Sequence, residues 1–170
     1  MAKKLRNRSK RNVTLDPRYE YEGYIVTTFP DFAEILYQVQ HDTEFSIVCR
    51  FRSQADIDFS MQLLCDLENF TLFVEEAEVY FDARSMDENF NHLVNFGRHQ
   101  EISLVGITQR SPQLNIKFRA QYSSLFSFNQ TEPADLKRLR DYGFDEEEIH
   151  DLAKYHYKVI GKDIEEITLA

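Results

Sequence analysis

The hydrophobic and polar positions of the chain predict short buried strands that alternate with amphipathic helices. The clearest run, Thr71–Glu76, places four mostly apolar, β-prone residues directly before Glu75 and Glu76. A short run of this kind is typical of a strand that is buried on both faces, as in a parallel sheet. Further strands are predicted at residues 12–15, 44–51, 102–107 and 122–128, with a final edge strand at 155–160.

Helix signals lie between these runs. Phe29-Pro30-Asp31 predicts a helix start, because proline is tolerated only in the first turn and aspartate suits an N-cap or first turn. Ser53 is a suitable N-cap for the next helix, and residues 2–11 fit either a short basic helix or a disordered arm. Further helices are predicted near residues 86–96, from residue 111, and at 132–142 and 145–153. This alternation favours a three-layer α/β fold with a mostly parallel sheet, in a single domain over residues 1–170.

The composition fits a globular protein. Of 170 residues, 42% are hydrophobic and 14% are aromatic, which is enough for a sizeable core. The net charge of -9 argues against a surface that binds nucleic acid generally. Basic residues nevertheless crowd the N-terminus, where residues 3–11 predict either a solvated arm or a contact with nucleic-acid phosphates.

Cysteine content and hydropathy narrow the class of protein further. Cys49 and Cys65 lie in apolar segments and have no histidine at ligand spacing, so we expect reduced core thiols and no zinc site. Free thiols of this kind predict a cytoplasmic protein. No apolar run approaches the roughly 18 residues that a membrane-spanning helix needs, so no membrane contact is predicted.

Two adjacent carboxylates at the end of a buried strand are the main chemical signal. Open α/β sheets bind ligands at the carboxyl ends of their strands, which is where Glu75 and Glu76 lie. Such a pair suits a metal-nucleotide site, in which one carboxylate holds Mg²⁺ through water and the other polarises a nucleophilic water. The alternative is a buried strand that ends in an acidic surface turn.

Three motifs in order resemble the HerA/FtsK-like branch of P-loop ATPases. Residues 13–21, Val-Thr-Leu-Asp-Pro-Arg-Tyr-Glu-Tyr, are similar to the second strand of that branch and its following turn. Residues 72–77 resemble its Walker B strand, and residues 97–112 resemble the segment in which a polar residue at a strand tip senses the terminal phosphate. The resemblance covers roughly residues 3–130. It implies kinship with DNA-packaging and DNA-translocation motors, encoded by a bacteriophage or another mobile element and acting in the host cytoplasm.

The resemblance also implies roles for individual residues. Glu76 would be the catalytic base, Glu75 the Mg²⁺ ligand and Gln109 the phosphate sensor. Arg98 and Arg84 would be arginine fingers that act across a subunit interface. The plainer alternatives are an inherited but idle pair of carboxylates, a hydrogen bond at a strand end for the glutamine, and solvated or ion-paired arginines.

Two features depart from the family pattern. The Walker B strand of the family normally ends Asp-Glu, whereas here it ends Glu75-Glu76, which moves the metal-binding carboxylate by about one methylene. The 170 residues also contain no G-x-x-x-x-G-K-[S/T] loop, the Walker A motif that supplies the N–H cradle and lysine for phosphates. Residues 1–11 occupy the place of the helix that follows this loop in the family, so the strand before the loop is missing too.

Three explanations of this gap stay open. The sequence is a piece of a longer ATPase, or a degenerate paralogue, or its missing strand comes from a partner. We expect no cofactor on the isolated chain and Mg-ATP only if a Walker A loop is supplied elsewhere. The favoured function is a binding or regulatory subunit of a DNA-packaging motor, acting as a homo-oligomer or with a protein partner. The alternatives are a fragment of an active packaging ATPase, and a virion or host-interaction protein that reuses the fold.

The missing strand leads to one structural prediction. Unpaired backbone groups are costly when buried, so a stable chain must pair the strands on either side of the gap. We therefore predict that the strand bearing Glu75, or the strand ending at Gln109, pairs directly with the strand at 122–128.

Overall fold

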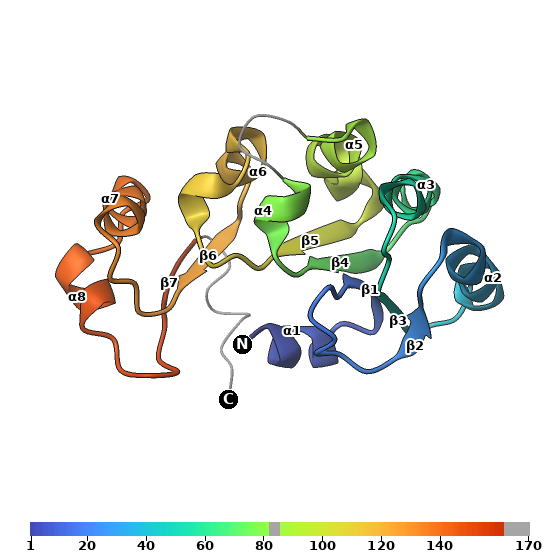
Figure 1. The fold of residues 1–170 in the computed structure, drawn as a ribbon, viewed down its shortest axis with the longest axis horizontal. Helices are drawn as coiled ribbons and strands as arrows, with labels where there is room; N and C mark the ends of the chain where they lie inside the picture. Colours follow the sequence, from blue (N-terminus) through green and yellow to red (C-terminus); the bar gives the residue numbers. More distant parts are fainter. Residues whose placement is uncertain (82–85, 162–170) are drawn as a thin grey trace.

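The protein is built around a five-stranded parallel sheet (Figure 1). The computed structural model describes residues 1–81 and 86–161. The strand order is β2-β3-β1-β4-β5, and every neighbouring pair is parallel. The strands are β1 (Arg11–Leu15), β2 (Tyr24–Val26), β3 (Phe45–Cys49), β4 (Phe70–Val74) and β5 (Ile102–Gly106).

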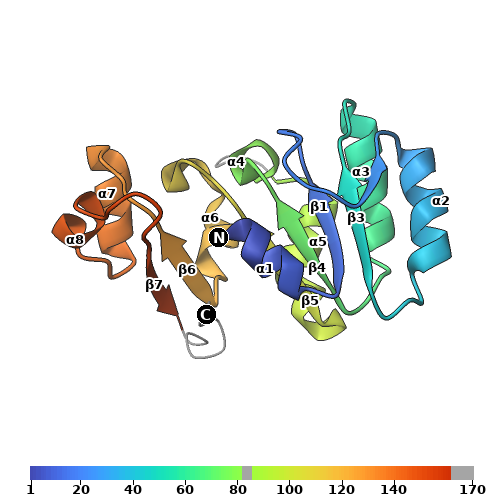
Figure 2. The ribbon, with the colours of Figure 1, turned by 90° about the horizontal axis from the view of Figure 1, so that it is seen from below.

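Helices cover both faces of this sheet (Figures 1 and 2). Helices α2 (Phe29–Val39), α3 (Gln54–Leu64) and α5 (Glu88–Phe96) lie on one face, whereas α1 (Ala2–Arg8) lies on the other. Ser53 caps α3 as predicted, because its Oγ accepts a hydrogen bond from the N–H of Asp56 at 3.1 Å. The predicted α/β fold with a mostly parallel sheet is confirmed.

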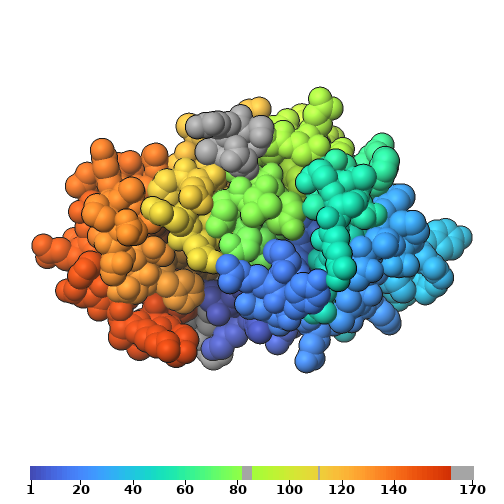
Figure 3. Space-filling model, viewed as in Figure 1, coloured from blue at the N-terminus to red at the C-terminus, as the bar shows by residue number. Residues whose placement is uncertain are grey.

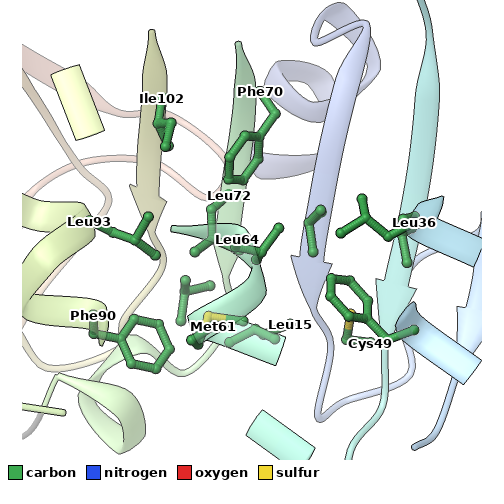
Figure 4. Close-up of a cluster of buried hydrophobic side chains, with 14 of the residues drawn as sticks. Leu15, Leu36, Cys49, Met61, Leu64, Phe70, Leu72, Phe90, Leu93 and Ile102 are labelled. Atoms are coloured by element: carbon green, nitrogen blue, oxygen red, sulfur yellow. The ribbon is translucent and has the colours of Figure 1, made fainter. Parts of the chain in front are cut away.

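The face toward α2, α3 and α5 holds the main hydrophobic core (Figure 4). Leu15 of β1 and Leu72 of β4 are at most 1% exposed, and they pack in one cluster with Met61 and Leu64 of α3 and Phe90 of α5. Complete burial of a side chain of this size contributes about 1.5–3 kcal/mol. This core fixes the strands whose ends carry the polar residues described below.

The face toward α1 is more polar than the sequence pattern predicts. Arg6 is only 7% exposed, and its guanidinium donates to Thr14 Oγ1 at 2.9 Å and to the carbonyl oxygen of Glu22 at 2.6 Å. It also donates to Ser46 Oγ, which donates in turn to Asn12 Oδ1 at 2.9 Å. Burial lowers the pKa of Arg6. The basic N-terminus is therefore a short helix that is hydrogen-bonded to the sheet, not a disordered arm.

A two-stranded antiparallel sheet follows the main sheet. Strand β6 (Ser124–Ser127) pairs with β7 (Lys158–Gly161), and helices α7 (Pro133–Asp141) and α8 (Glu146–His150) lie between them in sequence. A second, smaller core holds this part together, and its buried members are Leu139, Phe144 and Ile149. The final strand predicted from the sequence is thus present, shifted to the end of the predicted range.

The predicted pairing of β6 with β4 or β5 is wrong. Strand β4 lies between β1 and β5, and β5 is the last strand of the main sheet, while β6 pairs with β7. The prediction assumed that the unpaired edge would be buried. Instead, Leu104 and Gly106 of β5 are partly exposed, so water reaches part of this edge and lowers the cost of leaving it unpaired.

Several short elements escape the sequence pattern. These are β2, α4 (Ala77–Tyr80) and α6 (Ile116–Ala120), which are three to five residues long and too short to show a periodicity. A 3-10 turn, Gly97–Gln100, follows α5 where Gly97 was predicted to end that helix, and the helix predicted from residue 111 begins as a 3-10 turn, Ser111–Gln113. None of the helices in residues 1–81 and 86–161 is long and apolar enough to cross a bilayer.

Candidate functional site

The carboxyl ends of three adjacent strands bring polar side chains to one edge of the sheet. Asp16 follows β1, Glu75 and Glu76 follow β4, and Gln109 lies three residues beyond β5. Because β1, β4 and β5 are neighbours and parallel, these residues reach the same edge. This is the edge at which open α/β sheets bind their ligands.

Backbone hydrogen bonds hold the segments after β4 and β5 together. The N–H of Ile107 donates to the carbonyl of Val74 at 2.9 Å, and the N–H of Ala77 donates to the carbonyl of Ile107 at 2.8 Å. Between them, Glu76 adopts a left-handed conformation with φ 51° and ψ 50°, which is strained for a residue with a side chain. Its carboxylate Oε1 accepts a hydrogen bond from Gln109 Nε2 at 3.0 Å. Glu76 and Gln109 therefore lie on neighbouring strand tips, in contact with each other.

Arg18 contacts the same carboxylate oxygen of Glu76. This residue belongs to the turn after β1, and its Nε forms an ion pair with Glu76 Oε1. The arginine side chain is 50% exposed, so solvent screens the pair and its contribution to stability is small. The cation also offsets part of the negative charge of Glu76.

Glu75 is buried and bonded within the protein. It is 8% exposed, and its Oε1 accepts a hydrogen bond from the hydroxyl of Tyr21. Burial raises the pKa of Glu75, although the hydrogen bond from Tyr21 opposes this effect. Burial, together with the hydrogen bond to Glu75, raises the pKa of Tyr21. Tyr21 thus remains protonated and occupies a lone pair of this carboxylate.

An ion pair fixes the turn that carries Arg18 and Tyr21. Asp16 is fully buried and accepts hydrogen bonds from the N–H groups of Glu20 at 2.9 Å and Tyr21 at 3.2 Å. Its Oδ2 also pairs with Arg50 Nε at 3.1 Å, and Arg50 donates to the carbonyl of Tyr21 at 2.8 Å. In the space-filling view, the blue segment that contains this turn lies against the green segment around α4 (Figure 3).

Sequence reasoning found only part of this arrangement. Residues 16–21 were identified only as part of a motif that resembles the P-loop ATPase family. Arg18, Tyr21 and Arg50 were assigned no role. A usable signal existed for Asp16, because it directly follows the predicted strand at 12–15; Arg50 lies inside the predicted strand at 44–51 and gave no such signal. The contacts of Arg18 and Tyr21 with the two glutamates depend on the path of the turn, which sequence spacing does not specify.

The two candidate arginine fingers do not join this edge. Arg98 is exposed in the 3-10 turn that precedes β5, so it lies at the amino end of the strand, opposite Glu76 and Gln109. Within one chain it does not reach the carboxylates. Arg84 lies outside the described residues.

The described residues offer few ligands for a metal ion. Among them, no group of three or more histidine, cysteine or acidic side chains is arranged to hold one. Glu75 carries a raised pKa and a hydrogen bond from Tyr21, both of which oppose direct metal binding. Water-mediated contact with a Mg²⁺ ion that is held mainly by nucleotide phosphates is the arrangement that fits this chemistry.

Comparison with solved structures identifies proteins of the same fold. The chain is similar to the genome-packaging NTPase B204 of Sulfolobus turreted icosahedral virus 2 in complex with ATP-gammaS, with a TM-score of 0.70 and 18% identity over 94% of this chain and 80% of that one. The AMP complex of the same NTPase gives a TM-score of 0.70 and 20% identity over the same shares. The DNA-packaging ATPase B204 from Sulfolobus turreted icosahedral virus gives 0.65 and 20%, over 93% of this chain and 80% of that one.

These similarities show the fold, which is that of a P-loop-NTPase-like α/β domain. The identity is too low for the comparison to carry a function by itself. No protein-family model matches the sequence, and a search of the curated proteins finds no match either.

Proposed function

We propose that this chain is a relative of viral DNA-packaging ATPases that carries the water-activating side of a nucleotide site and does not hydrolyse ATP alone. The observation that carries the proposal is the 3.0 Å hydrogen bond between Gln109 and Glu76 at neighbouring strand tips. This contact is found in a fold similar to that of a packaging NTPase whose structures contain ATP-gammaS and AMP.

Each residue of the edge has a role in this proposal. Glu76 accepts a proton from the attacking water, because its carboxylate is held in place by the hydrogen bond from Gln109 and the ion pair with Arg18. Gln109 also reports the terminal phosphate, since its amide has a second donor besides the one that Glu76 uses. Glu75 contacts Mg²⁺ through water once the hydroxyl of Tyr21 turns away.

The proposed lack of activity follows from missing phosphate contacts. Phosphoryl transfer depends mostly on positioning and on charge neutralisation around the phosphates. The 170 residues contain no G-x-x-x-x-G-K-[S/T] loop, so the isolated chain lacks the usual N–H cradle and its lysine. We therefore propose that the chain acts as a binding or regulatory subunit, and that hydrolysis requires a phosphate loop from another polypeptide or another segment.

Arg98 can contact a nucleotide only if the chain assembles with another subunit. Its position at the opposite edge from Glu76 means that a second copy, or another subunit, is needed to bring it near a nucleotide. A homo-oligomer in which this arginine faces the neighbouring subunit meets that requirement. Light scattering after size exclusion measures the assembly, and Arg98→Ala tests whether the arginine lies in its interface.

Nucleotide affinity is the decisive measurement. Titration calorimetry with Mg-ATP should give no binding at micromolar concentrations, and phosphate release should match buffer alone. Glu76→Gln is compared with Glu34→Gln, an exposed glutamate on α2. Micromolar affinity, or turnover lost in Glu76→Gln but kept in Glu34→Gln, would overturn the inactive assignment and favour an active packaging ATPase. A stable complex formed without nucleotide, and unchanged by Glu76→Gln, would favour an interaction protein that reuses the fold.

A further inference from the structure

The last part of the described chain has a hydrophobic core of its own. Strands β6 and β7 with helices α7 and α8 form the second unit (residues 124–161), which encloses Leu139, Phe144 and Ile149. None of these three side chains belongs to the main core, and β6 pairs with β7 instead of the main sheet. Both ribbon views show α7 and α8 at the end of the molecule opposite α2 (Figures 1 and 2). A part with a separate core can change its position and keep its fold.

Two polar side-chain contacts join the second unit to the elements around the main sheet. Arg110 lies beyond β5, and its Nε pairs with Oδ2 of Asp135 in the first turn of α7 at 3.3 Å. Arg119 of α6 donates from Nη1 to the hydroxyl of Tyr142, at the end of α7, at 3.2 Å. Helix α6 belongs to the main sheet, because its Phe118 packs against the main core. Water can replace either partner of such contacts when the two parts separate.

Both contacts leave a buried polar atom without a hydrogen bond. Asp135 is only 3% exposed, and its Oδ1 has no hydrogen-bond partner in the described part of the chain. The Nε of Arg119 is buried too and has no partner within residues 1–81 and 86–161. Such an atom is costly while it stays buried, and water supplies its partner once it is exposed. Separation of the second unit from α6 therefore gains hydrogen bonds that offset those it breaks.

Arg110 connects these contacts to the candidate site. It directly follows Gln109, whose amide donates to Glu76 at 3.0 Å. The N–H of Arg110 donates to Thr108 Oγ1 at 3.0 Å, and its carbonyl accepts from the N–H of Gln113 at 3.0 Å. These bonds make a compact turn, in which neighbouring Cα atoms stay about 3.8 Å apart. A displacement of Arg110 therefore displaces Gln109 as well.

We propose that the second unit moves as a rigid body between a closed and an open position, and that this movement controls the contact between Gln109 and Glu76. The ion pair between Arg110 and Asp135 holds the closed position, in which Gln109 donates to Glu76. In the open position the ion pair is broken, the turn is released and the hydrogen bond is lost. Coupling of this kind needs one element with two arrangements, and either end can bias it. The proposal needs no nucleotide, so it can fail while the proposed function holds.

Residual dipolar couplings of the backbone amides test the movement in the full chain without nucleotide. In the native chain, the couplings of the main sheet and of the second unit should fit one common alignment, because the closed position dominates. Asp135→Asn removes the charge of the ion pair and keeps the size of the side chain, so the second unit should lose alignment relative to the main sheet. Asp141→Asn is the matched control. It removes a carboxylate that pairs with Arg138 inside the same helix at 3.5 Å, and it should keep the common alignment.

The side-chain amide protons of Gln109 test the coupling to the site. In Asp135→Asn their chemical shifts should move toward those found in Glu76→Ala, where the acceptor is absent, and in Asp141→Asn they should not move. Arg110→Gln removes the other partner of the ion pair and leaves the acid in the first turn of α7, where it also favours the helix dipole. This variant should therefore reproduce both effects, even if Asp135→Asn does not fold.

Three results would overturn the proposal. The first is a common alignment of the two parts in both Asp135→Asn and Arg110→Gln, which would show that the second unit does not move. The second is a loss of alignment with unchanged Gln109 shifts, which would show that the movement does not reach the site. The third is random-coil shifts for Leu139, Phe144 and Ile149 in the variants, which would show that the second unit unfolds instead of moving as a rigid body.

Discussion

Removal of the Asp16 carboxylate should be among the most destabilising single changes at the candidate site. Asp16 is fully buried, and it accepts two backbone N–H bonds as well as the ion pair with Arg50, whose side chain is 14% exposed. Asp16→Ala leaves a nearly buried guanidinium without its anion and two N–H groups without acceptors. Breaking a buried pair from one side costs about 3–5 kcal/mol. The loss is a large part of the 5–15 kcal/mol that stabilises a typical domain.

Urea denaturation followed by circular dichroism measures this loss. With a slope of about 2 kcal/mol per molar urea, the midpoint should fall by roughly 2 M. The double variant Asp16→Ala/Arg50→Met removes the stranded charge as well, so it should lose less stability than Asp16→Ala alone. Asp66→Ala, at an exposed position, should change stability by less than about 0.5 kcal/mol. A loss below about 1 kcal/mol in Asp16→Ala would refute the view that this carboxylate anchors the turn.

Further predictions concern pH, thiol chemistry and the N-terminus. Burial raises the folded-state pKa of Glu75 above its ordinary 4.5, so its stabilising contribution is present below that value and is lost as pH rises through the raised pKa. Glu75→Gln should therefore gain stability relative to the native chain between pH 4 and pH 8, and a pH-independent difference in urea midpoints would contradict this. Burial raises the pKa of Cys65 to about 11, so iodoacetamide at pH 8 should modify it about a hundredfold more slowly than an ordinary thiol, while Cys49 reacts only on unfolding. Mass spectrometry resolves the two sites, and rapid labelling of Cys49 in the folded protein would contradict its burial. Arg11 donates to the carbonyl oxygens of residues 40, 42, 68 and 69, so Arg11→Met should cost about 1–3 kcal/mol in urea denaturation and Arg11→Lys should restore less than half of it. Full recovery of stability in the lysine variant would show that the planar guanidinium group is not needed.

The main sheet could be predicted because buried parallel strands have a simple signature. Strands β3, β4 and β5 are short and mostly apolar, and β1 carries Val13 and Leu15 between polar residues. The helix between two such strands is marked by its cap, as Ser53 marks α3. The short strand β2 has no comparable run and was not predicted. The pairing of β6 was predicted wrongly, because the sequence alone does not show which strand edges are exposed to water.

The candidate site could be predicted in part for the same reason. Glu76 and Gln109 each follow an apolar run, and the parallel topology brings such strand ends together. Tyr21 and Arg18 reach the two glutamates through a turn that is anchored by Asp16 and Arg50, far apart in sequence. Contacts of this kind depend on the folded path of the chain, and no local pattern encodes them.

The hydrogen bonds between α1 and the sheet have a consequence for local unfolding of the domain. Because Arg6, Thr14 and Ser46 meet through hydrogen bonds, release of α1 hydrates these polar atoms. Such an opening exposes less surface than global unfolding does, so it depends less on denaturant. Backbone amides of α1 should therefore exchange hydrogen through local unfolding, whereas those of β4 should exchange only through global unfolding. The first helix can leave the sheet as a separate cooperative unit without melting the rest of the domain.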